Sequence, residues 1–109
     1  MCIRDRLGVD RAVLQDVIST SSGSSWVVQH GCPMPGAVPG SAASNGFKPG
    51  FMAKLMLKDL RLSQAASHMA ASPTPIGAAA TAAFQQHVNN GHGDLDMSSI
   101  CKLIAPEVE

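Results

Sequence analysis

The sequence predicts an all-α fold, on two observations. Alanine, methionine and leucine are plentiful, whereas aromatic residues make up only 4% of the 109 residues and tyrosine is absent. This composition favours helices over sheet. In several segments, apolar residues also recur at the three- and four-residue spacing of a helix,. The length allows one small domain with a single modest core.

The first predicted helix covers residues 11–19. Asp10 stands in the position of its N-cap, and a serine-rich run that leads to Gly23 ends it,. From residue 21 to residue 50, Gly, Pro, Ser and Asn dominate without sustained periodicity, so we expect a long loop between the first two helices. Loops longer than about 12–15 residues are often functional, which makes the lone tryptophan, Trp26, a candidate functional residue.

The rest of the chain predicts three more helices. The strongest covers residues 51–71 and is ended by the prolines of "SPTP",. The next begins with Pro75 as its first residue and ends at "NNGHGD". A short final helix covers residues 97–104, with Asp96 placed to cap it,.

Charge and composition exclude several classes of function. Eight basic and eight acidic side chains give zero formal charge, which is not the signature of a nucleic-acid binder or of a protein that binds anionic membranes. No apolar run approaches the roughly 20 residues that cross a bilayer, and no secretory signal is evident. Cys2, Cys32 and Cys101 form no CxxC pair, which favours a reducing compartment and a structural role for the thiols,.

The sequence contains only weak candidates for a metal site, a catalytic serine or a phosphate-binding loop. His87 and His92 are separated by "VNNG", which breaks the helix, and no third ligand is evident, so we predict no metal site and expect surface or capping histidines,. "SSGSS" lacks the features of a nucleophile elbow, and "GHGD" is too short for a phosphate loop.

Lys58 is the strongest candidate in the chain. It shares a helix face with Leu55 and Leu62,. A buried and unpaired ammonium would cost several kcal/mol, so this group must reach water, a carboxylate or a ligand. Two interpretations stay open: a lysine whose stem covers apolar neighbours while its ammonium reaches solvent, and a lysine at the wall of a cleft that meets an anion.

Four segments occur in an informative order: "SSGSSW", "CPMPG", "GFKPGFMAKLMLKDL" and "GHGDLDMSSICKL". Over about residues 7–103 they resemble the C-terminal helical domain of the 3-hydroxyisobutyrate dehydrogenases, in the β-hydroxyacid dehydrogenase family. The resemblance implies the 6-phosphogluconate dehydrogenase-like helical fold for residues 7–109. Residues 1–6, "MCIRDR", do not resemble the family and are expected to be a non-native N-terminus.

The resemblance also implies roles for four residues. Lys58 and Asp59 match the family's "KDL" segment, whose lysine lies beside the nicotinamide end of the cofactor and whose aspartate helps to hold the site. Trp26 and Phe51 match aromatic positions that border the substrate pocket. The family often has a further aromatic residue where this chain has Gly31, so that side of the pocket is expected to differ. The family's catalytic-lysine motif and GxGxxG segment are not found in these residues, so no catalytic residue is assigned here.

The function implied is that of the C-terminal part of an NAD-dependent 3-hydroxyisobutyrate dehydrogenase, which forms methylmalonate semialdehyde in valine breakdown; NADP is the alternative cofactor. Its expected partners are an N-terminal Rossmann domain of the same enzyme, a small hydroxyacid and further copies in a homo-oligomer, without nucleic acid or membrane. We expect the fragment to be inactive alone. The expected location is the cytoplasm, or the mitochondrial matrix in a eukaryote. The alternatives are a related enzyme, such as tartronate semialdehyde reductase, and a non-catalytic helical interaction module.

Overall fold

The computed structural model describes residues 6–108, and every regular element in that range is helical. An isolated antiparallel bridge joins Met52 to Asp96. The all-α prediction is confirmed. The elements in chain order are the α-helices α2 (Arg11–Ser19) and α3 (Trp26–His30), the 3-10 helix η1 (Ala43–Asn45), the α-helices α4 (Ala53–Met69) and α5 (Pro75–His87), the π-helical segment η2 (Val88–His92) and the 3-10 helix η3 (Met97–Leu103).

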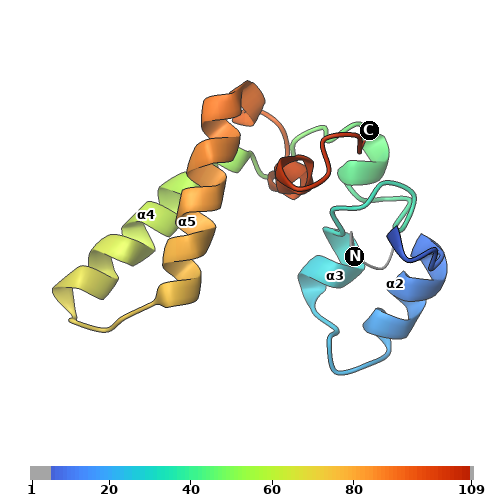
Figure 1. Cartoon of the computed structure of the whole chain (residues 1–109), viewed down its shortest axis with the longest axis horizontal. Helices are drawn as coiled ribbons and strands as arrows, with labels where there is room; N and C mark the ends of the chain where they lie inside the picture. Colours follow the sequence, from blue (N-terminus) through green and yellow to red (C-terminus); the bar gives the residue numbers. More distant parts are fainter. Residues whose placement is uncertain (1–5, 109) are drawn as a thin grey trace.

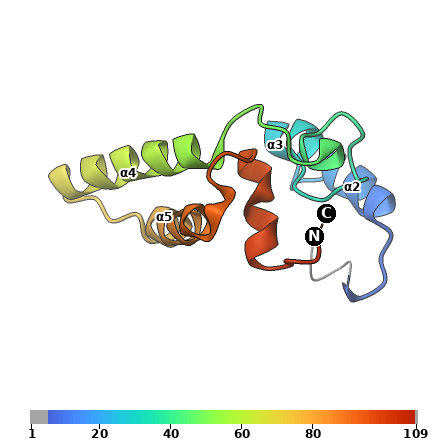
Figure 2. The ribbon, with the colours of Figure 1, turned by 90° about the horizontal axis from the view of Figure 1, so that it is seen from above.

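The helices are arranged in two groups. α4 and α5 lie side by side as an antiparallel hairpin that projects from the rest of the chain (Figure 1). α2 and α3 lie in the other group, and η3 lies between the two (Figure 2). The Cα radius of gyration is 14.7 Å, whereas a compact chain of this length would have about 13 Å. The fold is therefore open, and much of the hairpin surface is exposed.

The main hydrophobic core lies outside the hairpin. It joins the turn-rich segment after α3 to η3 and the residues that follow it. Phe47 is its largest fully buried side chain, at 2% exposure. The segment that the sequence predicts as a loop therefore supplies most of the core. Its members are Cys32, Met34, Ala37, Ala43, Phe47, Cys101, Ala105 and Val108.

The long connection between α2 and α4 contains a helix, α3, where the sequence predicts only a loop. α3 forms within it because the side chain of Ser25 accepts the N–H of Val28 at 3.1 Å, as an N-cap does,. The N–H of Gly31 donates to the carbonyl of Val27 at 2.8 Å and closes the helix. A serine ahead of a short apolar run and a glycine after it are the local signals for this helix.

The other helices lie where the sequence predicts them, with shifts of at most two residues at the bounds. Asp10 caps α2 by accepting the N–H groups of Ala12 and Val13 at 2.9 and 3.1 Å. Pro75 is the first residue of α5. The final helix is a 3-10 helix, and the side chain of Asp96 caps it as predicted. These predictions succeed because caps and prolines act through neighbouring residues.

His87 is a buried residue, so its assignment as a surface or capping histidine is wrong. It is completely inaccessible because the end of α5 packs against η3. Its Nε2 lies 2.7 Å from the hydroxyl of Ser99, and its ring centre lies 4.9 Å from that of His92. Among the described residues, its Nδ1 has no hydrogen-bond partner. Burial, followed by the positive charges of His92 and Lys102, lowers the pKa of His87.

This lowered pKa predicts a loss of stability in acid. A histidine whose pKa is lower in the folded state contributes fully above its unfolded pKa of about 6.5. Its contribution is lost as the pH falls from that value through the folded pKa. Urea unfolding between about pH 8 and pH 5 should therefore show a falling free energy of unfolding below about pH 6.5. We expect His87→Gln to flatten this dependence and His68→Gln, at an exposed position on α4, to keep it; equal slopes in the two variants would contradict the assignment.

Candidate functional site

A cavity of about 510 Å³ lies between α3, the start of α4 and the start of η3. Trp26 and Phe51 both line it, although they come from separate parts of the chain. The structure therefore brings together the two aromatic residues that the resemblance assigns to a substrate pocket. The complete lining is Trp26, His30, Gly31, Ala42, Gly50, Phe51, Met56, Asp96 and Met97.

Trp26 forms an exposed wall of this cavity. It is the first residue of α3 and is 67% exposed. Its ring stacks on that of His30, with 5.0 Å between ring centres and 17° between planes. The Nδ1 of His30 also lies 3.1 Å from the carbonyl oxygen of Trp26. Residues four apart share a helix face, so one turn of helix presents both rings to the cavity.

Phe51 precedes α4, and its main chain is held by two neighbouring residues of the lining, Asp96 and Met97. Its N–H donates to Oδ2 of Asp96 at 3.0 Å, and its carbonyl accepts the N–H of Met97 at 2.7 Å. These bonds explain why α4 begins at Ala53 rather than at residue 51.

Asp96 is a buried carboxylate with four donors. Its Oδ2 accepts the N–H groups of Gly50 and Phe51, both at 3.0 Å, and its Oδ1 accepts the N–H of Ser98 at 3.0 Å and the hydroxyl of Ser98 at 2.6 Å. Burial raises the pKa of Asp96, but the hydrogen bonds from Ser98, Phe51 and Gly50 together outweigh burial and leave that pKa below its usual value,. Asp96 is therefore ionised at neutral pH. The sequence predicts only the capping role of Asp96, because its bonds to Gly50 and Phe51 join distant parts of the chain.

Lys58 and Asp59 lie on α4 but do not line the cavity. The Nζ of Lys58 lies 2.9 Å from Oδ1 of Asp59, and the two side chains are 62% and 50% exposed. Leu55 and Leu62, on the same face, are themselves 39% and 63% exposed. The ammonium thus reaches both water and a carboxylate. An exposed pair of this kind contributes about 0–1 kcal/mol, so the two groups can be rearranged by a ligand at little cost.

A second, apolar cavity of about 240 Å³ adjoins the first. Gly31, Met56 and Met97 line both cavities. Because Gly31 has no side chain, nothing but main chain stands at that point of the shared wall. Phe84 brings α5 into this cavity, a contribution that its sequence position does not reveal. The lining is Val27, Gly31, Pro33, Met56, Phe84, Met97, Ser98 and Ile100.

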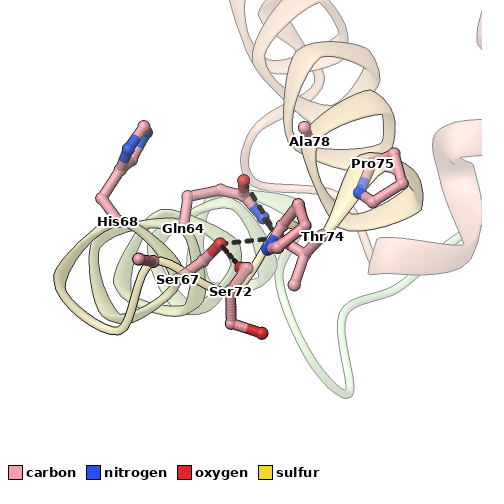
Figure 3. A pocket seen from close by; sticks show the side chains of 9 residues that line it. Gln64, Ser67, His68, Ser72, Thr74, Pro75 and Ala78 are labelled. Carbon is pink, nitrogen blue, oxygen red and sulfur yellow. Dashed lines mark hydrogen bonds between the residues drawn. The ribbon is translucent and has the colours of Figure 1, made fainter.

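A hollow of about 450 Å³ at the tip of the hairpin has a different character. Figure 3 shows that Gln64, Ser67 and Thr74 point toward one another across the turn between α4 and α5, whereas the ring of His68 points away from them. The Nε2 of Gln64 donates to the hydroxyl of Thr74 at 3.1 Å, and that hydroxyl donates to Oγ of Ser67 at 3.2 Å. Ser67 in turn donates to the carbonyl of Ser72. These groups satisfy one another and close the hairpin, so we assign the hollow a structural role.

A metal site and a membrane span would each leave a recognisable pattern in residues 6–108. No group of three or more His, Cys, Asp and Glu residues in that range could hold a metal ion. None of its helices combines the length and the hydropathy that crossing a bilayer requires.

Comparison with known proteins gives a consistent result. A family model described as "NAD-binding of NADP-dependent 3-hydroxyisobutyrate dehydrogenase" matches residues 1–104. The chain is 43% identical over 98 residues to the 3-hydroxyisobutyrate dehydrogenase of Pseudomonas aeruginosa, an alignment that covers 88% of this chain and 33% of that protein. It is 36% identical over 99 residues to the NAD-dependent L-serine dehydrogenase of the same organism, with 91% and 33% covered.

A solved structure agrees with these sequence matches. The 3-hydroxyisobutyrate dehydrogenase of Mycobacterium tuberculosis, solved with L-serine, is similar to this chain with a TM-score of 0.90 and 37% identity, covering 94% of this chain and 35% of that one. The chain spans about a third of the length of the curated relatives it matches. It therefore belongs to the 3-hydroxyisobutyrate dehydrogenase family and has the fold of that family's helical C-terminal domain.

Proposed function

We propose that the chain is the helical part of an NAD-dependent 3-hydroxyisobutyrate dehydrogenase and that the cavity between Trp26 and Phe51 forms one wall of its substrate site. One observation carries the proposal: in a chain of this family, two aromatic residues from separate segments line the same cavity. Its volume of about 510 Å³ lies within the range of about 300–1,000 Å³ usual for small-molecule sites.

The chemistry of the lining indicates which part of the substrate this wall receives. Asp96 is negatively charged, and its oxygens already accept four hydrogen bonds. A substrate carboxylate would be repelled there. Met56 and Met97 are flexible and apolar, and they lead into the second cavity,. We infer that this wall contacts the methyl branch and carbon chain of 3-hydroxyisobutyrate, and that the substrate carboxylate is bound by another part of the enzyme.

Lys58 is the group that fits a nicotinamide nucleotide. Its exposed ammonium has three donors, which suit ribose hydroxyls, the nicotinamide carboxamide oxygen or a phosphate,. Asp59 would stay beside the amine on α4 as a second polar group of the site. What the nicotinamide supplies when bound is a hydride acceptor. NAD is our proposal because the resemblance implies it, and NADP is the alternative in keeping with the family's description.

The remainder of the site must come from another part of the protein. We propose that a Rossmann domain of the same enzyme binds most of the nucleotide and supplies the catalytic lysine, and that the enzyme is a homo-oligomer in the cytoplasm, or in the mitochondrial matrix of a eukaryote. The pathway we propose is valine breakdown. L-serine is the second candidate substrate, because a relative 36% identical to this chain is named an L-serine dehydrogenase.

A chimera tests this function. The 109 residues would replace the matching third of the Pseudomonas aeruginosa 3-hydroxyisobutyrate dehydrogenase. We expect the chimera to form NADH with 3-hydroxyisobutyrate and to do so more slowly with L-serine. The isolated chain should form none with either, because the catalytic lysine and the groups proposed to bind most of the nucleotide and the substrate carboxylate belong to another part of the enzyme. A chimera that folds, by circular dichroism and by size, yet turns over neither compound would refute the proposal, as would turnover by the isolated chain.

A further inference from the structure

We propose that Asp96 is a positioning residue of the candidate site: its carboxylate holds the main chain of Phe51 and so sets the part of the cavity wall that Phe51 forms. The meaning of this wall for substrate binding rests on the proposed function. The hydrogen bonds from Gly50 and Phe51 to Asp96 are independent of that function, because they are present in the chain itself.

Phe51 needs such a support because of its place in the chain. It lies before the first turn of α4, so no intrahelical hydrogen bond fixes its main chain,. Its N–H and its carbonyl are instead bonded to Asp96 and Met97. Its side chain is only half-buried, so packing restrains the ring less than it restrains a core residue. The position of the ring therefore follows from the position of its main chain.

The two oxygens of Asp96 have separate tasks. Oδ1 accepts both groups of Ser98 and thereby caps η3. Oδ2 accepts the N–H groups of Gly50 and Phe51 from a distant segment. A residue that served only as a helix cap would need the first set of bonds and not the second. The second set is the observation that a capping role leaves unexplained.

Two neighbouring main-chain hydrogen bonds do not depend on the side chain of Asp96. The N–H of Asp96 donates to the carbonyl of Phe47 at 3.0 Å, and the N–H of Ala53 donates to the carbonyl of Leu95 at 2.8 Å. A change of the side chain at position 96 leaves both bonds in place. Losing the carboxylate should therefore release the N–H of Phe51, whose carbonyl keeps its bond to the N–H of Met97, while the core and α4 keep their positions.

The chain contains three phenylalanines, which makes this separation measurable. Labelling the full 109-residue chain with 4-fluorophenylalanine gives one ¹⁹F signal each for Phe47, Phe51 and Phe84. In Asp96→Ser, the serine is a favoured N-cap and can still accept the N–H of Ser98, but it has no second oxygen for Gly50 and Phe51. We expect the Phe51 signal alone to move and broaden. The amides of Gly50 and Phe51 should exchange with solvent about 10- to 100-fold faster, as for the loss of a hydrogen bond to a charged group.

Ser98→Ala is the matched control, because it removes one donor to Oδ1 and leaves both bonds to Oδ2. It should keep all three signals. An unchanged Phe51 signal in Asp96→Ser, or an equal change in all three signals, would overturn the proposal. If that variant does not fold, exchange in the unmodified chain decides instead: protected amides at Gly50 and Phe51 support the proposal, and rapid exchange at both overturns it. Each of these outcomes is independent of whether the chimera is active.

Discussion

Replacing Phe47 with alanine is expected to lower the free energy of unfolding by about 3–5 kcal/mol. Phe47 is 2% exposed and belongs to the main core. The Nζ of Lys102 lies 4.9 Å above the centre of its ring. The backbone φ of Phe47 is 58°, in the left-handed region that costs a non-glycine residue energy,. Alanine would keep that backbone cost and lose the burial that offsets it.

Urea unfolding followed by circular dichroism measures this loss. A domain of ordinary stability has only about 5–15 kcal/mol in total, so the variant should lose a large fraction of its stability. Ile76→Ala is the matched control, since Ile76 is an apolar residue on α5 with 83% exposure, and it should change the free energy by about 0.5 kcal/mol or less. Equal losses in the two variants would show that the turn-rich segment is not the main core.

Replacing Lys58 with alanine in the active chimera is expected to lower kcat/KM about 10- to 100-fold. A hydrogen bond from a charged group is worth about 1.5–3 kcal/mol, and each 1.36 kcal/mol corresponds to a factor of about ten. The stability of the chain should change by no more than about 1 kcal/mol, because the Lys58–Asp59 pair is exposed,. Steady-state kinetics should therefore show a clear loss of kcat/KM, whereas urea unfolding should show little change in the free energy of unfolding.

Lys54→Ala provides the control for charge on α4. Lys54 is also exposed and forms an ion pair, in its case with Asp94. It lines neither of the two cavities at the candidate site. Its replacement should leave the kinetics unchanged. Unaltered kinetics in Lys58→Ala would identify Lys58 as a solvent-exposed lysine that covers apolar neighbours, and equal losses in both variants would point to the general charge of the helix.

The parts of the fold that are predictable from sequence are those set by local interactions. Asp10, Pro75 and Asp96 each act on residues within a few positions, through caps or through a fixed φ, and the helices begin where these residues indicate,. The burial of Phe47 and His87 depends instead on segments that meet only in the folded chain. The local sequence pattern therefore does not predict that they are buried. The turn-rich composition around Phe47 predicts an exposed loop instead.

In the candidate site, too, some features are predictable from the sequence and others depend on contacts between distant segments. The assignment of Trp26 and Phe51 to a substrate pocket rests on the resemblance, since neither periodicity nor composition assigns them to a common cavity. The apolar neighbours of Lys58 indicate either a solvent-exposed lysine or a cleft, and the structure places it in solvent beside Asp59 rather than in the cavity. The contact between Asp96 and Phe51 could not be inferred from one sequence, because 45 positions separate the two residues.

A crystal structure of the chimera with NAD and 3-hydroxyisobutyrate tests most directly whether this cavity is one wall of a dehydrogenase active site. The account predicts the carbon chain of the substrate between Trp26 and Phe51, with the Nζ of Lys58 within hydrogen-bond distance of the nucleotide. A substrate bound elsewhere, or an ammonium of Lys58 that faces bulk solvent away from the nucleotide, would contradict it.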